Sequence, residues 1–599
     1  MKKVFRLLFF LLAAHFTQSA ANDKLTGTVM GTPTTGHACL EAFDGNPETF
    51  YASQDDSYAW VGLDLGQPHV ITRVGWMPRN VEGGAERVVL GVFEGANRED
   101  FMDALPLFII TEGGIAGTMS QADVNCSRGF RYVRYVGPSE AYCNIAEVEF
   151  YGQPGEGDDS GLFRLTNQPT VTIHTQDGEI PYDKEHDISA LITIIGPDGA
   201  TQLSEPGTVR ERGNGSRTFP KRPYRLKFEQ KKRVLDAPAK AKVWNLVSNY
   251  SDKTLMRNLL AFEMSRCFGM PFTPYAQSVD VLLNGEYKGT YLLCDALKVE
   301  KNRIELETMK PEDISGEALT GGYLVEIDAY AYEENCWFSS EMGNPVTIQY
   351  PSDDEIVPEQ QAYIEGAFNR MENDWETYLD MNTFLRHFLI GELSGNTDTY
   401  WSVYMYKHRG DDAFYTGPVW DFDLAFENDY RTFPINDKTD FVYRSGGSCC
   451  GQMKEFVDRI AVYSDAAREQ MLNIWAEARQ DKITAQYLLD FIDRYESNLQ
   501  QTQRLNFLRW PIMDIKVQKN PVVWGGYAEE VQNVRRYLQE RLEWMDNKLG
   551  YEEPSGINST AYSDLKDKDT WYSLDGRKLN GKPTVKGLYI HNGRKVVIM

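Results

Sequence analysis

The sequence has little positive charge for its size. Its 599 residues contain 62 Lys and Arg against 87 Asp and Glu, so the formal net charge at pH 7 is −25. Nucleic acids and anionic membranes are bound through clustered cations, so this acidity argues against both kinds of partner. A site for a phosphate-bearing ligand must therefore be a local basic segment.

Zinc ligands, several catalytic signatures and long apolar runs are also missing. None of the eight His residues is paired at metal-ligand spacing, and we find no convincing GxSxG, HExxH or P-loop segment. After the first 21 residues no apolar stretch approaches 20 residues. We therefore expect a soluble mature protein without a membrane span.

Residues 1–21 have the pattern of a cleaved signal peptide. Lys2, Lys3 and Arg6 precede a short apolar stretch at 7–14 and small residues at 19–21. We expect export to the periplasm, the cell surface or the medium. All eight Cys residues follow this segment, so disulfides are possible, and we expect a few bridges beside buried thiols.

Composition divides the rest of the chain into modules. Residues 22–152 contain short strands between Gly, Asn and Asp turns, which predicts an all-β sandwich, and 153–162 is a polar linker. Residues 163–549 predict an α+β domain with a helical C-terminal part. A second linker at 550–570 precedes a short β tail at 571–599. Apolar residues at 3.6-residue spacing predict helices at 255–268, 383–393, 485–499 and 528–549.

A basic segment lies at 210–233, with ten Lys or Arg and two Glu, which gives a local charge of +8. Its glycine-containing loop at 212–216 allows backbone amides to approach an anion. The alternating strand at 224–228 places Arg225 and Lys227 on one face. The segment is either a phosphate cradle or a solvated face that offsets an acidic protein.

Three aspartates are predicted to gather at one end of a hairpin. Asp398 precedes a strand at 402–407, and a return strand carries Asp421 and Asp423. A two-residue turn at 410–411 makes the numbers of cross-strand partners sum to 821, which places Asp398 opposite Asp423 within about two residues.

Clustered carboxylates repel one another unless a cation or a proton intervenes. Mg²⁺ typically uses one or two carboxylates together with substrate phosphates. This end of the hairpin therefore predicts a metal site at Asp421 and Asp423, with Asp398 left as a candidate base. The alternative is a set of surface carboxylates, with Asp398 capping a turn.

Several segments together resemble the CotH family, atypical kinases named for a spore-coat protein. They follow the family order across 163–549 and comprise 212–214, 220–228, 255–258, 283–291, 321–326 and 419–423. The resemblance implies a kinase-like fold that uses ATP and Mg²⁺ or Mn²⁺ to phosphorylate hydroxyls of a protein acceptor.

The resemblance also implies roles for individual residues. Asp398 matches the catalytic-loop aspartate and Asp421 the metal-binding aspartate. Lys221 and Lys227 are both candidates for the lysine that contacts the nucleotide phosphates, and Arg257 matches the arginine following the first helical segment.

Arg212 and Arg225 complete the set of nucleotide-binding candidates in the basic segment. The chain departs from the family pattern at Ser402, where many members carry an Asn that binds a second metal. Asp423 or a water would then supply that oxygen. Asp295 stands where Glu is common.

The N-terminal module resembles the discoidin class (coagulation factor 5/8 type C), which is galactose-binding-like. The matching segments are 42–49, 60–66 and 145–152. The resemblance implies a structural Ca²⁺ held by Asp44, Asn46, Thr49 and Glu147, and a glycan ligand; a metal-free sandwich is the alternative. The tail resembles C-terminal sorting or surface modules of exported Bacteroidetes proteins.

Three functions remain in view. The first is an exported CotH-like kinase with a glycan- or surface-binding sandwich. The second is a catalytically inactive, kinase-like cell-surface or carbohydrate-binding protein, which Ser402 and the scarcity of ATP outside the cytoplasm favour. The third is a carbohydrate-active enzyme that uses two carboxylates.

Overall fold

The computed structural model describes residues 23–435, 441–444, 451–552, 571–573, 578–579, 581–591 and 594–598. Internal contacts group the chain into two units, Met1–Met545 and Asp546–Met599. The predicted signal peptide and most of the second predicted linker lie outside the described residues. Among the described residues, no helix is both long and apolar enough to cross a bilayer.

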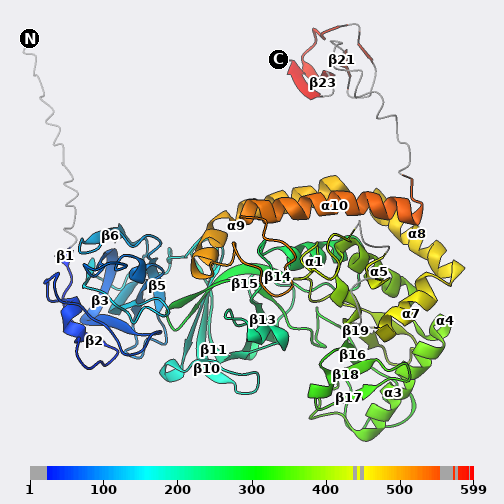
Figure 1. Cartoon of the computed structure of the whole chain (residues 1–599), viewed down its shortest axis with the longest axis horizontal. Coiled ribbons are helices and arrows are strands. Elements are labelled where there is room, and N and C mark those ends of the chain that lie inside the picture. Colours follow the sequence, from blue (N-terminus) through cyan, green and yellow to red (C-terminus); the bar gives the residue numbers. More distant parts are fainter. Residues whose placement is uncertain are drawn as a thin grey trace, which may run out of the picture. The chain divides into compact units, whose positions relative to one another are not determined.

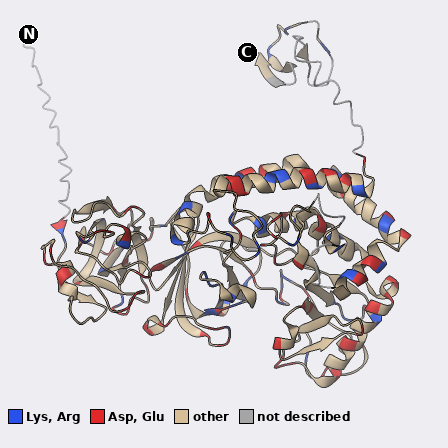
Figure 2. Cartoon of the chain, viewed as in Figure 1, with Lys and Arg blue, Asp and Glu red and all other residues tan. Residues whose placement is uncertain are grey.

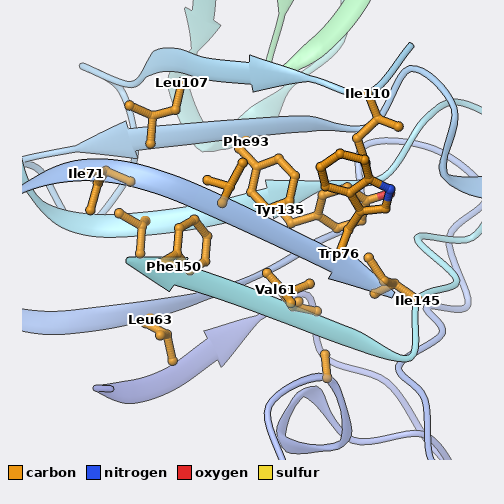
Figure 3. Close-up of a cluster of buried hydrophobic side chains, with 14 of the residues drawn as sticks. Val61, Leu63, Ile71, Trp76, Phe93, Leu107, Ile110, Tyr135, Ile145 and Phe150 are labelled. Atoms are coloured by element: carbon orange, nitrogen blue, oxygen red, sulfur yellow. The ribbon is translucent and has the colours of Figure 1, made fainter. Parts of the chain in front are cut away.

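The N-terminal module is an all-β sandwich, as predicted (Figure 1). Its strand order is β1-β8-β3-β7-β4-β5, and β2 and β6 also pair with β3. Strand β3 is longer than the short strands predicted for this module and spans 18 residues. Figure 3 shows Trp76, Phe93 and Phe150 packed together in its core. The strands are β1 (Asp23–Lys24), β2 (Thr28–Gly31), β3 (Trp60–Met77), β4 (Val92–Ala96), β5 (Leu105–Ile109), β6 (Ser120–Asp123), β7 (Gly129–Val136) and β8 (Glu147–Pro154).

A closed barrel with the strand order β10-β11-β12-β13-β15-β14-β9 follows the sandwich. In β12, Tyr224, Leu226 and Phe228 are buried in the core, whereas Arg225 and Lys227 face outward, which confirms the predicted alternation. The strands are β9 (Thr170–Thr175), β10 (Ile188–Ile195), β11 (Thr201–Glu211), β12 (Tyr224–Lys232), β13 (Ala241–Val247), β14 (Ala276–Leu283) and β15 (Glu286–Asp295).

A second sheet has the order β17-β18-β16-β19-β20. Strands β19 and β20 pair Met405 with Thr416 and Lys407 with Phe414, so the predicted register, in which partners sum to 821, is confirmed. The connection is longer than predicted and spans 408–413. The strands are β16 (Tyr323–Asp328), β17 (Trp337–Ser339), β18 (Pro345–Tyr350), β19 (Ser402–Lys407) and β20 (Phe414–Thr416).

The return strand was predicted to carry Asp421 and Asp423. In the structure it ends at Thr416, so that prediction is wrong. Pro418 has no N–H to offer a strand ladder. Asp421 adopts a left-handed backbone conformation, with a φ of 65°. The two aspartates therefore lie on an irregular segment, whose geometry the hairpin pattern does not describe.

Most helices lie in the second half of the chain. The four predicted helices are present as α1, α5, α9 and α10. Helix α9 packs against β15. Figure 2 shows acidic and basic residues interspersed along α8 and α10. The helices are α1 (Arg257–Cys267), α2 (Gly316–Leu319), α3 (Pro358–Asn373), α4 (Trp375–Tyr378), α5 (Met381–Ser394), α7 (Gly451–Ala461), α8 (Asp465–Gln480), α9 (Ala485–Arg509) and α10 (Tyr527–Leu549).

The second unit contains a small sheet with the order β22-β21-β23-β24, in agreement with the predicted β tail. The rings of Trp571 and His591 stack at 4.1 Å between centroids. The strands are β21 (Trp571–Tyr572), β22 (Lys578–Leu579), β23 (Gly587–His591) and β24 (Arg594–Ile598).

The predicted disulfide bridges are absent from the described residues. Cys39, Cys126, Cys143, Cys267, Cys294 and Cys336 are all free thiols. Cys449 and Cys450 lie outside the described residues.

Candidate functional site

A cavity of about 910 Å³ brings the predicted acids together with part of the basic segment. Asp398, Asp421 and Asp423 line it, and so do Arg212 and Arg225 from the β11–β12 region of the barrel. Carboxylates and guanidinium groups thus share one solvent-filled space. A polyphosphate bound through a metal ion needs both kinds of group.

The turn that carries Asp398 is fixed by the end of α5. Gly395 ends that helix with a φ of 69°, a conformation that suits glycine. Asp398 then lies in a short 3-10 helix, η6 (Thr397–Tyr400). The side chain of Asn396 accepts a hydrogen bond from the Asp398 backbone N–H and donates one to the Asp421 carbonyl, at 3.0 Å. Asn396 therefore links the two acid-bearing segments.

The Asp398 carboxylate is held by Arg431, whose Nη2 lies 3.0 Å from Asp398 Oδ1. Asp429 also pairs with this guanidinium, through Nη2 and Nε. Burial raises the pKa of Asp398, and the attraction of Arg431 offsets only part of that rise. Arg431 is not recognisable as a site residue from the sequence, because it lies in an irregular segment without a characteristic spacing.

Asp421 and Asp423 form a strained electrostatic pair. Asp423 Oδ2 accepts a hydrogen bond from Ser251 Oγ at 2.6 Å, whereas the Asp421 side chain is exposed and lines the cavity. Burial raises the pKa of both carboxyls, and repulsion from Asp423 and Asp398 raises that of Asp421 further. A bound cation or proton is needed to relieve this repulsion.

The donor set fits a hard divalent cation that is completed by a ligand. Within the described ranges, no three His, Cys, Asp or Glu side chains converge closely enough to hold a metal by themselves. Asp421 and Asp423 offer two carboxylates, which is the number that Mg²⁺ commonly takes from a protein when phosphate oxygens and waters fill its other positions.

Arg257 does not line the cavity, although it was a nucleotide-binding candidate. It is 1% exposed, pairs with Asp252 and lies 3.9 Å from Glu530. Its Nε also donates to the Ala425 carbonyl at 3.1 Å. Arg257 therefore anchors the chain just after Asp423 and has no free donor directed at the cavity.

Lys221 and Lys227 also lie outside the cavity lining. The Lys221 amino group is buried and donates to the Thr290 carbonyl at 2.5 Å and to Asn506 Oδ1 at 2.8 Å. Burial lowers its pKa to about 7. Lys227 lies on the outer face of β12, 3.7 Å from Asp187. Neither of the two candidate lysines contacts the cavity, and the cations that line it from this segment are arginines.

Ser402, at the position of the second metal ligand in many family members, binds a neighbouring carboxylate. Its Oγ donates to Glu326 Oε1 at 3.0 Å, and Gln349 donates to Glu326 Oε2 at 2.9 Å. Burial, with repulsion from Asp328, raises the pKa of Glu326 to about 8. Glu326 lines the cavity, and the sequence analysis had not singled it out.

The predicted calcium ligands of the sandwich are partly assembled. Asp44 Oδ1 accepts hydrogen bonds from the Asn46 N–H at 2.8 Å and from Thr49 Oγ1 at 3.0 Å. Glu147 is 2% exposed, and neither carboxylate oxygen has a hydrogen-bond partner. Burial, with the nearby Asp44, raises the pKa of Glu147 to about 7. An unpartnered buried carboxylate beside an all-oxygen loop fits a hard cation.

The same module carries a solvent-reached stack of three side chains. The rings of His37 and Phe50 lie 3.9 Å apart, and the Arg79 guanidinium lies 3.5 Å from the Phe50 centroid. His37 also contacts Glu41 at 3.3 Å. This stack combines an aromatic ring with several hydrogen-bonding groups on exposed loops.

Comparison with known proteins finds similarity in two parts of the chain. The family model described as CotH kinase protein matches residues 209–545. No curated protein matches the chain.

Two carbohydrate-binding modules and one further domain of known structure are similar to the N-terminal sandwich. The CBM62 of Clostridium thermocellum Xyl5A is 43% identical, with 22% of this chain and 98% of that chain covered and a TM-score of 0.21. The CBM32 of AlyQ, solved with 4,5-unsaturated mannuronic acid, is 16% identical, with 21% and 97% covered and a TM-score of 0.19. The C-terminal domain of a Bacteroides fragilis chitobiase is 21% identical, with 22% and 100% covered and a TM-score of 0.19.

Replacing Asp421 with Asn is expected to make the metal-free protein more stable at pH 7. The folded-state pKa of Asp421 is raised, so the folded form binds a proton that the unfolded form has lost above pH ~4, and stability falls as the pH rises. Unfolding midpoints of both proteins, measured between pH 4 and 8 in a chelator, should diverge with rising pH. Parallel curves would contradict the repulsion described here.

Proposed function

Because the chain belongs to the CotH kinase protein family, we propose that it is an exported kinase that transfers the γ-phosphate of ATP to hydroxyls of a protein acceptor with Mg²⁺ or Mn²⁺. The observation that carries this proposal is the single cavity that joins Asp398, Asp421, Asp423 and Arg212. Export is supported by the signal-peptide pattern of the first 21 residues.

Two of the aspartates have a metal-binding role in this proposal, and the third acts on the acceptor hydroxyl. Asp421 and Asp423 would hold the metal, whose charge would offset that of the phosphates. Asp398 orients the acceptor hydroxyl and takes its proton as the phosphoryl group is transferred. Arg431 keeps the Asp398 carboxylate in place. In phosphoryl transfer, such positioning and charge neutralisation supply most of the catalysis.

Arg212 is the phosphate-binding cation of this proposal. No hydrogen bond or ion pair of its guanidinium is found among the described residues, and the group lies 5.7 Å from the centre of the Trp420 ring. The charge of Arg212 lowers the pKa of Asp421, so the guanidinium lies near the two proposed metal-binding aspartates. A guanidinium with free donors binds phosphate oxygens in a bidentate manner.

A second candidate function is a kinase-like scaffold without activity. Ser402 favours it, because its hydroxyl is bound to Glu326 and the family's second metal ligand is missing at this position. The scaffold would share the cavity and the sandwich but would not bind nucleotide.

Asp398→Asn and Asp421→Asn should each lower phosphoryl transfer by about 10²–10⁴-fold, because one removes the proton acceptor and the other a metal ligand. The assay follows label from radioactive ATP, with Mn²⁺ or Mg²⁺, to the chain itself or to casein. Asp412→Asn, in the exposed β19–β20 connection, is the control and should keep the parental rate. Absence of ATP binding at millimolar concentration, with glycan binding intact, would establish the scaffold instead.

Arg212→Ala and Arg257→Ala should affect different properties, ATP affinity in the first and stability in the second. Loss of Arg212 should weaken ATP binding about 10- to 100-fold, as expected for a hydrogen bond to a charged group, without lowering stability. Loss of Arg257 should cost about 3–5 kcal/mol of unfolding free energy, because Asp252 is left buried and unpaired. Calorimetric ATP titration and denaturant unfolding measure the two effects. An unchanged ATP affinity in Arg212→Ala would remove this residue from the nucleotide site.

For the sandwich we propose a glycan ligand and a structural Ca²⁺. The stack of His37, Phe50 and Arg79 supports the first, because glycans bind to aromatic faces bordered by hydrogen-bonding groups. The unpartnered carboxylate of Glu147, next to Asp44, supports the second.

Ca²⁺ should raise the melting temperature of the parent protein and leave Glu147→Gln unaffected. A ligand present at 100 times its Kd stabilises the folded state by about 2.7 kcal/mol. In a chelator, Glu147→Gln should be as stable as the parent or more so, because a neutral amide replaces an unpartnered buried carboxylate. Glu48→Gln, at an exposed position of the loop that carries Asp44 and Thr49, is the matched control. Equal Ca²⁺ shifts in the parent, Glu48→Gln and Glu147→Gln would exclude this site.

A further inference from the structure

One cation on the wall of the large cavity has no role in the reaction described above. Lys519 lines the cavity and lies in the loop between α9 and α10, at residues 510–526. Its amino group lies 5.7 Å from the centre of the Tyr430 ring, and no hydrogen bond or ion pair of this group is found among the described residues. An unpaired amino group at a cavity is available to an anion from outside the chain.

The loop that carries Lys519 is held against the segment that follows Asp423. The Tyr430 N–H donates to the Lys519 carbonyl at 2.9 Å. Asn520 Nδ2 donates to the Ser251 carbonyl at 3.1 Å, and the Ser251 hydroxyl in turn binds Asp423. The backbone of Lys519 is therefore tied to the proposed metal site, although it comes from a distant part of the chain.

Four charged side chains gather around the proposed proton acceptor, Asp398. Arg431 pairs with both Asp398 and Asp429. Burial raises the pKa of Asp398, whereas the charges of Arg431 and Lys519 lower it. Two cations therefore face two carboxylates as long as Asp398 is ionised.

Arg431 has donors that the protein does not use. Its Nε and Nη2 bind Asp429, Thr397 and Asp398, whereas no contact of Nη1 is found in the part of the chain that the structure describes. The Arg431 side chain is 15% exposed and lines the cavity. Arg431 Nη1 and the Lys519 amino group are thus both available to an anion beside Asp398.

We propose that Lys519, together with Arg431, binds the phosphoryl group while it passes from ATP to the acceptor. This inference rests on the proposed kinase reaction. In that reaction a bond forms between the acceptor oxygen and the γ-phosphorus, and the bond from this phosphorus to the β–γ bridging oxygen breaks. ADP leaves with the electron pair of the broken bond, and the acceptor proton passes to Asp398.

The proton transfer strengthens the contact at the moment when it matters. Once Asp398 takes the acceptor proton, its negative charge is lost, and Asp429 alone no longer offsets Lys519 and Arg431. The surplus positive charge acts on the oxygens of the phosphoryl group between the acceptor and the departing ADP. The two cations therefore stabilise the transition state more than they stabilise bound ATP.

Lys519→Met should lower kcat for phosphoryl transfer about 10- to 100-fold, the effect of a lost hydrogen bond to a charged group. The Kd of ATP should change by less than about threefold, because the contact is made only during transfer. Lys519→Arg should restore most of the rate. Transfer from radioactive ATP to casein and calorimetric ATP titration measure the two quantities. Lys516→Met is the matched control, because Lys516 is exposed in the same loop but does not line the cavity.

A second readout does not depend on turnover. ADP with aluminium fluoride mimics the phosphoryl group during transfer. Aluminium fluoride should tighten ADP binding in the parent protein and in Lys516→Met, but much less in Lys519→Met. The melting temperature of Lys519→Met should equal that of the parent, because the amino group has no ion pair in the free protein.

The outcomes separate this inference from the proposed function. A parent protein that binds no ATP would overturn both. A parent that transfers phosphate, with an unchanged kcat in Lys519→Met, would overturn this inference alone. Equal losses in Lys516→Met and Lys519→Met would do the same, and so would a higher KM for the acceptor as the only effect of Lys519→Met.

Discussion

Repulsion among neighbouring carboxylates is the constraint on which the rest of the site depends. Asp421 and Asp423 share one end of the large cavity, with Asp398 close enough to raise the pKa of Asp421. Folding alone does not compensate this cost, because Ser251 supplies a single hydrogen bond to the pair. Either a proton or a cation relieves this repulsion, and for this reason we propose that a metal ion binds here.

Side chains outside the cavity fix the positions of these aspartates. Asn396 ties the turn of Asp398 to the backbone of Asp421, and Arg257 fixes the chain after Asp423 through the Ala425 carbonyl. Such contacts place charges of one sign near one another and keep them there. The proposed nucleotide then meets a preorganised site, in which little reorganisation accompanies phosphoryl transfer.

Periodic features of the fold could be predicted from the sequence, and irregular ones could not. The alternation in β12 and the β19–β20 register follow from side-chain period and a turn signal, and both are correct. The roles of Lys221 and Arg257 were carried over from a resemblance, and both side chains turn out to be buried among partners from α9 and α10, which no local pattern reveals. Arg431 could not be predicted either, because its contact with Asp398 joins two irregular segments.

The most direct test of the central claim is the affinity for Mn²⁺, followed by electron paramagnetic resonance with and without a non-hydrolysable ATP analogue. Two carboxylates alone bind a divalent ion weakly, whereas added phosphate oxygens complete its coordination. The account predicts weak Mn²⁺ binding that tightens strongly when the nucleotide analogue is present. An Mn²⁺ affinity that is the same in both conditions would contradict it.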